Sequence, residues 1–271
     1  MTPDLNESAF PALSLQVESF YAGLMATAAP GFKVDEDHGL GGKLFYVGEL
    51  DPQGRTLVIG ANIAGATSLS ATADAAAQKQ ALRDGVIDFL VTSLDEALRI
   101  LKNQVRKREA VAVCVAAAPE TIQWEMLERG VLPDLVRPAD EPSAHSPFVS
   151  QGARQILTRT QQDNSALLTW RVASAPAQWL HKLDAIALEC VPPEDWPVRR
   201  WLRLAPRYLG RLAQGTRLLI CDRAVSADFI ERVREQVERG VIETRVEIQV
   251  TSGRLHDQHF FVSPGASGNA R

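Results

Sequence analysis

The sequence contains few cysteines, and their placement suits neither disulfides nor metal binding. Cys114, Cys190 and Cys221 are the three cysteines among 271 residues, and they form no Cys-x-x-Cys pair. An odd number at such wide spacing gives no disulfide framework and no zinc site. Each lies in an apolar segment, as is typical of a reduced core residue in a cytoplasmic protein.

A basic excess, long apolar runs and a targeting segment are also absent. The formal net charge is −4. A protein that binds nucleic-acid phosphates needs a basic face, so we expect no nucleic-acid partner. No apolar run has the length of a membrane span, and the N-terminus "MTPDLNESAF" lacks the basic start and apolar stretch of a signal peptide. We therefore expect a cytoplasmic protein with no membrane partner.

From residue 43 onward, short apolar segments alternate with helical patterns. The segment "AVAVCVAAA" is apolar throughout, which is typical of a parallel strand covered on both faces. The helix that precedes it begins with a capping box from Ser93 to Glu96. This alternation, with short connections, predicts an α/β fold with a doubly wound parallel sheet. Strands are expected at 43–50, 86–91, 110–118 and 133–138, and helices at 93–109 and 119–129.

A polar, weakly patterned stretch suggests where this first domain ends, and a shorter set of elements follows it. We expect a smaller α/β lobe with strands near 166–174, 216–222 and 243–250. Its helices are expected at 176–190, from Trp196 onward, and at 226–240 with Ser226 as the N-cap. The expected organisation is an N-terminal segment 1–42, a first domain 43–150, a linker 151–165, the lobe 166–264 and a disordered tail 265–271.

The loop "ADEPSAHSP" resembles a loop of the urocanase (urocanate hydratase) family. That family writes Thr-Asp-Gln-Thr-Ser-x-His-x-Pro after a helix that ends in Arg-Gly and a short strand. Here "ERGVLPDLV" is similar to the helix end and strand that precede the family loop. Asp140, Ser143, His145 and Pro147 match the loop itself. Gln and Thr of the family are replaced by Glu and Pro, and an insertion, "RPA", precedes the loop.

The resemblance continues, in the same order, from about residue 32 to 264. It includes "GKLFYVGEL", "IAGATSLSAT", "TSLDEALRIL", "TWRVAS", "VPPEDWPVRRWLRLA", "TRLLICD" and "TSGRLHDQHFFVSP". Periodicity alone leaves 56–72 open between strand and helix, and the resemblance implies a helix to about Gly65 and then a strand. It also implies a Rossmann-like first domain. Family segments that this chain lacks include those with the active-site cysteine and a His-His-Gly-Gly-Gly run, so the chain resembles a shortened, degenerate relative.

The family uses tightly held NAD as an electrophile, and its diphosphate lies on a turn written Gly-Leu-Gly-Gly-Met-Gly-Gly-Ala-Gln. Here the turn is "ELDPQGRTL", in which only Gly54 is kept. Asp51 adds negative charge, Pro52 removes an amide donor, and Arg55 offers a cation whose side chain fills the space. A Glu and an Arg of the family fall at Thr72 and Ala77, and its His-Gly-Asn falls at 116–118. We therefore expect no cofactor, or NAD if the family cofactor is retained.

If a pocket exists, it should lie at the carboxyl ends of the parallel strands. The expected binding residues there are Gly54, Thr72, Asp140, Ser143 and His145. The resemblance makes Asp257 and Arg254 the catalytic candidates. A hydrolytic triad is not expected, because triads are assembled in space and the spacing of three residues within one loop does not indicate one. A metal site is not expected either, because His256 and His259 would face opposite sides of a strand.

Two functions from different classes remain open. The first is a non-catalytic urocanase-like protein that keeps its fold to bind a small molecule or a protein partner, with a link to histidine degradation. The second is a compact urocanate hydratase-type lyase that uses bound NAD as the electrophile. The absent glycine turn and cysteine segment favour the first. The expected partners are a small molecule or a protein, and a homodimer is left open.

Overall fold

The computed structural model describes residues 9–28, 31–138, 146–157, 165–252 and 255–264. It divides into two compact units, one of Leu15–Arg159 and one of Met1–Ser14 with Thr160–Arg271. Residues 15–42 therefore belong with the first domain, although the sequence suggested a separate segment 1–42. The division at Arg159 falls within the expected linker 151–165. The tail 265–271 lies outside the described residues.

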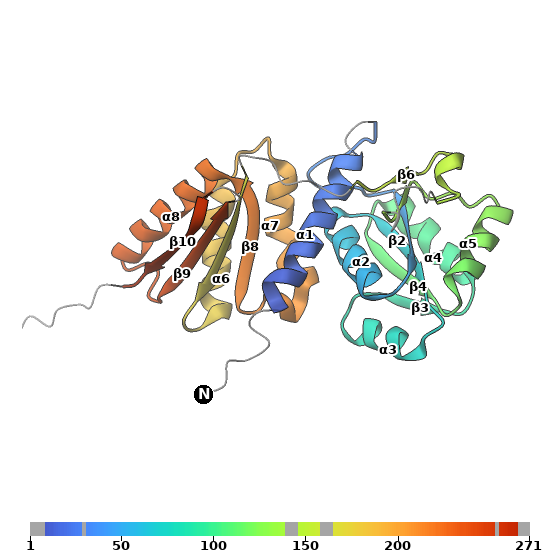
Figure 1. The fold of residues 1–271 in the computed structure, drawn as a ribbon, viewed down its shortest axis with the longest axis horizontal. Coiled ribbons are helices and arrows are strands. Elements are labelled where there is room, and N and C mark those ends of the chain that lie inside the picture. The colour runs from blue at the N-terminus through green and yellow to red at the C-terminus, as the bar shows by residue number, and fades with distance from the viewer. Residues whose placement is uncertain (1–8, 29–30, 139–145, 158–164, 253–254, 265–271) are drawn as a thin grey trace, which may run out of the picture. The chain divides into compact units, whose positions relative to one another are not determined.

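The unit Leu15–Arg159 contains a six-stranded parallel sheet with the order β3-β4-β2-β1-β5-β6. Figure 1 labels four of its strands, β2, β3, β4 and β6, and the helices α2, α4 and α5 beside them. Every neighbouring pair in this sheet is parallel, which confirms the doubly wound, Rossmann-like architecture. The two residues of β6 were not anticipated, because they lie inside the expected linker. The strands are β1 (Leu44–Glu49), β2 (Thr67–Ala71), β3 (Phe89–Val91), β4 (Val111–Val115), β5 (Leu135–Val136) and β6 (Arg154–Gln155).

Helices cover both faces of this sheet. Residues of α4 and α5 share one buried cluster with Tyr46 and Val113, while Phe45 and Val47 of β1 are buried on the opposite face, where α2 packs. All five residues of β4 are buried, as expected for "AVAVCVAAA". The helices are α1 (Ala9–Ala28), α2 (Pro52–Ala64), α3 (Ala75–Arg83), α4 (Leu94–Lys107) and α5 (Pro119–Glu128), and η1 (Val149–Gln151) is a 3-10 turn.

The helix α2 is buried on all sides, which explains why periodicity could not classify its sequence. Residues Thr56–Ala64 are all buried. One side of α2 contacts the sheet, and on another side a Cβ at Gly60 would lie 3.4 Å from the carbonyl oxygen of Val17 in α1. A helix enclosed in this way shows no polar face. Gly65 ends α2 with φ of 90°, and β2 follows, as the family resemblance implied.

The second unit contains a four-stranded antiparallel sheet with the order β10-β9-β7-β8. Helices and strands are mixed as expected for an α/β lobe, but the sheet is antiparallel and β10 follows β9 with no helix between them. Leu168 and Trp170 of β7 and Ile248 of β9 are buried beneath the helices, and the Trp170 ring lies 5.0 Å from that of Phe229. The elements are β7 (Ser165–Val172), α6 (Pro176–Cys190), α7 (Trp196–Leu209), η2 (Gly210–Ala213), β8 (Thr216–Asp222), α8 (Arg223–Glu238), β9 (Val246–Ser252) and β10 (Leu255–Val262).

The start of α8 corrects one expectation from the sequence. The helix begins at Arg223, and the carboxylate of Asp222 caps it by accepting from the amide of Ala224 at 2.8 Å. Ser226 lies inside the helix, where its hydroxyl donates to the carbonyl of Arg223. Both residue types make good caps, and the end of β8 decides between them.

Among the described helices, none combines the length and apolar character needed to cross a membrane.

Candidate functional site

The order in which successive strands are added to the sheet reverses between β1 and β5. From β1 the chain proceeds to β2 on one side, and after β4 it crosses to β5 on the other side of β1. Open α/β sheets bind ligands at the carboxyl ends of strands at such a point. Asp51 follows the end of β1, and Arg137 follows the end of β5. These strand ends are the candidate functional site.

Asp51 occupies the N-terminus of α2, where a Rossmann-like domain would receive a diphosphate. Its carboxylate accepts a hydrogen bond from the amide of Gly54 at 2.5 Å and serves as the N-cap. Pro52 is the first residue of the helix and has no N–H to donate. The positive end of the helix dipole and its free amide donor are thus satisfied by an acidic side chain of the chain itself.

Arg137 holds this acidic cap in place from the neighbouring strand end. Its Nη2 lies 3.6 Å from Oδ2 of Asp51, and its Nη1 donates to the carbonyl of Glu49 at 3.5 Å. The guanidinium also donates to the side-chain amide of Gln53. The contacts of Arg137 therefore join the end of β5 to the whole β1–α2 turn. We call Asp51 and Arg137 the switch-point pair.

Gly54 has a packing role that does not need a ligand. A Cβ at this position would overlap the carbonyl oxygen of Glu49 and lie 3.1 Å from Oδ1 of Asp51. Only glycine lets the first turn of α2 approach the end of β1 so closely. The one glycine kept from the family turn is therefore required by the fold itself.

Two further polar residues near the strand ends, Arg55 and Thr72, are engaged within the chain. Arg55 forms an ion pair with Asp84 at the end of α3, so its cation is directed to another partner. The amide of Thr72 donates to Val115, and its hydroxyl accepts from the amide of Asp74 at 3.3 Å. Its carbonyl accepts from the side-chain amide of Gln78 at 2.8 Å. Thr72 thus organises the β2–α3 turn.

The strand β4 ends in alanines, which supply no side-chain hydrogen bonds. The amide of Ala116 donates to the carbonyl of Val91, and Ala118 precedes α5 without a capping side chain. Pro119 is the first residue of α5. This strand end offers no charged or polar side chain to a cofactor.

None of the three cysteines has an activated thiol. Burial raises the pKa of Cys114 to about 11, and burial is also the main cause that raises the pKa values of Cys190 and Cys221 to about 12. The ordinary value is 9.0. A nucleophilic cysteine needs the opposite shift, toward thiolate at neutral pH.

Several expected site residues lie where side chains are not described. Asp140, Ser143, His145 and Arg254 are outside the described residues, and so the crevice proposed for the first three is untested. Asp257 lies on β10, but only its backbone is described. His256 and His259 are also on β10. Within the described ranges, no group of three or more His, Cys, Asp or Glu side chains is placed to hold a metal.

Arg137 is the residue that the sequence analysis missed. It is the first residue of the insertion "RPA", which distinguishes this loop from the family loop. The signal was therefore visible: a basic residue was added at one strand end while an acidic residue replaced a glycine at the neighbouring one.

The sequence was also compared with models of known protein families. The family model of the urocanase Rossmann-like domain matches residues 21–168, more than half of the chain. The chain belongs to the urocanase family.

Proposed function

We propose that this chain has lost the lyase reaction of its family and keeps the fold to bind a small ligand or a protein partner. The observation that carries the proposal is the position of Asp51 on the N-terminus of α2. A dinucleotide diphosphate needs the same backbone donors and the same positive helix end. A carboxylate already bound there competes with the diphosphate and repels it.

The other residues around the turn support the same conclusion. Pro52 supplies no amide donor, Arg55 is paired with Asp84, and Ala116 replaces a family histidine. The residues present therefore do not fit NAD, and no reaction step is assigned through it. The pKa values of the three thiols present are raised, so none of them is suited to replace the active-site cysteine of the family segment that this chain lacks.

The direct test is cofactor content. We expect the purified full-length chain to contain no NAD by mass spectrometry. Calorimetric titration with NAD should show no binding tighter than high micromolar. A urocanase with the complete glycine turn, purified in the same way, is the positive control. Stoichiometric NAD in this chain would contradict the proposal.

The ligand of this proposal would lie at the strand ends, with the loop after β5 contributing to it. Asp140, Ser143 and His145 belong to that loop, which follows Arg137 and Pro138. An imidazole that gains charge near neutral pH suits recognition of a small anion, so His145 is the proposed recognition residue. Once a thermal-shift screen finds a stabilising compound, His145→Ala should abolish the shift and leave the stability of the free protein unchanged. An unchanged shift would remove the loop from the site.

A second candidate is a compact urocanate hydratase-type lyase, and membership of the family is what favours it. In that case Asp257 and Arg254 would be catalytic, NAD would supply the electrophile, and the chain would act in histidine degradation in the cytoplasm. Incubation with urocanate and NAD, followed by ultraviolet absorbance, tests it. Consumption of urocanate that disappears in Asp257→Asn would establish this candidate and exclude the first.

A further inference from the structure

The second unit contains a cavity of about 400 Å³ between α8 and the hairpin of β9 and β10. Small-molecule sites commonly have volumes of about 300–1,000 Å³. One wall is a single stripe of α8, because its residues recur every three or four positions. The floor comes from the side of the sheet that faces the helices. The lining residues used below are Arg223, Ala227, Ile230, Arg234, Val250 and Phe260.

Arg223 is the unusual residue of this cavity. Its Nε has almost no solvent exposure and, among the described residues, no hydrogen-bond partner. Within the described part of the chain, no carboxylate pairs with its guanidinium. A buried guanidinium N–H without a partner is unfavourable, so this group favours an incoming acceptor.

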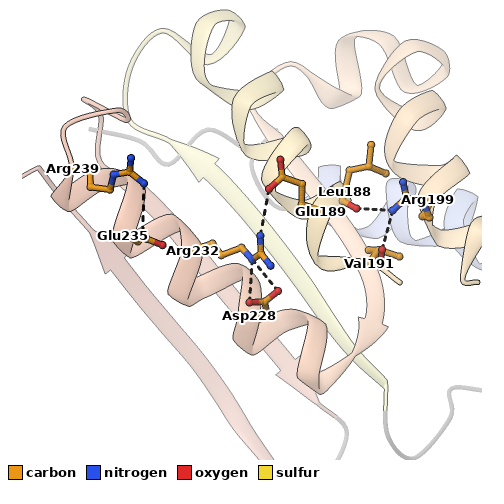
Figure 2. Close-up of polar contacts among 8 residues, drawn as sticks. All are labelled: Leu188, Glu189, Val191, Arg199, Asp228, Arg232, Glu235 and Arg239. Carbon is orange, nitrogen blue, oxygen red and sulfur yellow. Dashed lines mark hydrogen bonds and ion pairs between the residues drawn. The ribbon is translucent and has the colours of Figure 1, made fainter. Parts of the chain in front are cut away.

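Two arginines further along α8 and outside the cavity differ in this respect. Arg232 donates to both oxygens of Asp228, at 3.1 and 3.0 Å, and lies 3.4 Å from Glu189 of α6 (Figure 2). Arg239 lies 3.5 Å from Glu235, also shown in Figure 2. The helix thus provides carboxylate partners for the arginines outside the cavity. Arg223, which lines it, has none among the described residues.

Arg234 adds a second positive charge to the cavity. Its guanidinium lies 5.5 Å from the ring of Phe260, and this cation–π contact orients it. Its Nη1 is 3.9 Å from Glu231, whose side chain is 80% exposed, so that pair is weak in water. Ile230 and Val250 are buried beside these charges. Glu231 also lines the cavity, so the cavity combines two cationic side chains, one largely exposed carboxylate and an apolar floor.

We propose that this cavity binds a small organic anion. Its carboxylate or phosphate oxygens accept from Arg223, whose planar fork matches either head group. An aromatic or other apolar body packs on Ile230, Val250 and Phe260, beneath Arg234. All these residues belong to the second unit, so the site is independent of whether the Rossmann-like unit binds NAD.

Three ring compounds of similar size test the proposal on the full-length chain. Benzoate and phenyl phosphate carry the two possible head groups, and benzamide is a neutral analogue of benzoate. In calorimetric titrations we expect at least one anion to bind saturably and about tenfold more tightly than benzamide. The tighter of the two anions identifies the preferred head group.

Two variants locate the binding in the cavity, and a third is their matched control. Arg223→Gln should lower the affinity for the more tightly bound anion by about tenfold or more. Ala227→Trp keeps both charges and fills the cavity, and it should weaken binding to a similar degree. Arg239→Gln makes the same change of charge near the end of the same helix, outside the cavity, and should leave affinity unchanged.

Circular dichroism and thermal denaturation establish that each variant is folded. If Arg223→Gln does not fold, Ala227→Trp decides the question. The proposal is wrong if neither anion binds, or if benzamide binds as tightly as benzoate. Wild-type affinity in a folded Arg223→Gln or Ala227→Trp protein would also overturn it.

Discussion

The guanidinium of Arg137 lies 3.6 Å from the carboxylate of Asp51 and joins the carboxyl ends of β5 and β1. These are the strand ends at which the order of the sheet reverses. The family resemblance puts a cofactor anion at this place. In this chain the protein itself supplies an anion there, the carboxylate of Asp51, and its counter-charge, the guanidinium of Arg137. On the proposal made above, the switch-point pair occupies the place where the family resemblance puts a cofactor diphosphate.

The first prediction is that Asp51 stabilises the fold mainly as a helix cap. Asp51→Ala should lower the free energy of unfolding by about 1 kcal/mol, because the amide of Gly54 loses its acceptor. Arg137→Gln should cost less, since the pair is partly exposed. In a double-mutant cycle measured by urea denaturation, the two changes should couple by less than about 1 kcal/mol.

Asp74 provides the matched control for this cycle. It caps α3 by accepting from the amide of Ala76 at 2.7 Å, and α3 starts at a different strand end. Asp74→Ala should lower the free energy of unfolding by a similar amount, and its effect should be additive with that of Arg137→Gln. Equal coupling of Arg137 to both caps would show that the cycle reports a general effect of charge.

The second prediction separates two glycines of α2. Gly54→Ala should destabilise the protein by about 1–3 kcal/mol, because its Cβ would overlap the Glu49 carbonyl. At Gly60 a Cβ has its nearest neighbours at 3.4 Å, an ordinary contact. Gly60→Ala should therefore be neutral or stabilising, since alanine favours a helix by up to about 1 kcal/mol. Thermal denaturation of both variants measures the difference, and equal destabilisation would contradict it.

Part of the first sheet could be predicted because β1 and β4 are largely apolar runs. The residues of β4 are buried on both faces, and "VAVCV" can be recognised as a strand without knowing which strands or helices it contacts. The helix α2 could not be classified by period, because α1 covers the side that would otherwise be polar. The strand β6 is two residues long, too short for any periodicity.

The antiparallel sheet of the second unit could be predicted only in part. Buried residues alternate along β9, a pattern typical of a sheet with one covered face, and this signal was present in "ETRVEIQV". The strand directions depend on how α6, α7 and α8 return the chain, which local sequence does not specify. Arg137 was missed for a similar reason. Its partner is 86 positions away in sequence, and only the sheet order brings the two together.

The third prediction concerns the thiols. With a pKa of about 11, the Cys114 thiol at pH 8 is thiolate in only about one molecule in a thousand. Ellman's reagent should therefore react slowly with all three cysteines in the native protein and quickly after denaturation in urea. Raising the pH toward 9 should speed the native reaction about tenfold per unit, because the thiolate fraction grows in proportion. A cysteine that reacts within seconds at pH 7 would reveal an activated thiol and would favour the lyase.

The last prediction is that the anion site of the first unit can be partly restored. In the variant Asp51→Gly with Pro52→Gly and Arg137→Ala, the N-terminus of α2 regains amide donors and loses its internal anion. Inorganic phosphate and NAD should both bind more tightly than to the wild-type chain, by about tenfold, the value of one charge-assisted hydrogen bond. Binding of NAD should remain weak, because Thr72 and Ala116 still stand where the resemblance gives the family a Glu and a His at the neighbouring strand ends. Asp74→Gly, which opens the N-terminus of α3, is the control and should leave NAD affinity unchanged. Calorimetry gives both affinities. If the triple variant binds NAD no better than the wild type, the switch-point pair does not block the cofactor, and the loss must lie in the other strand ends.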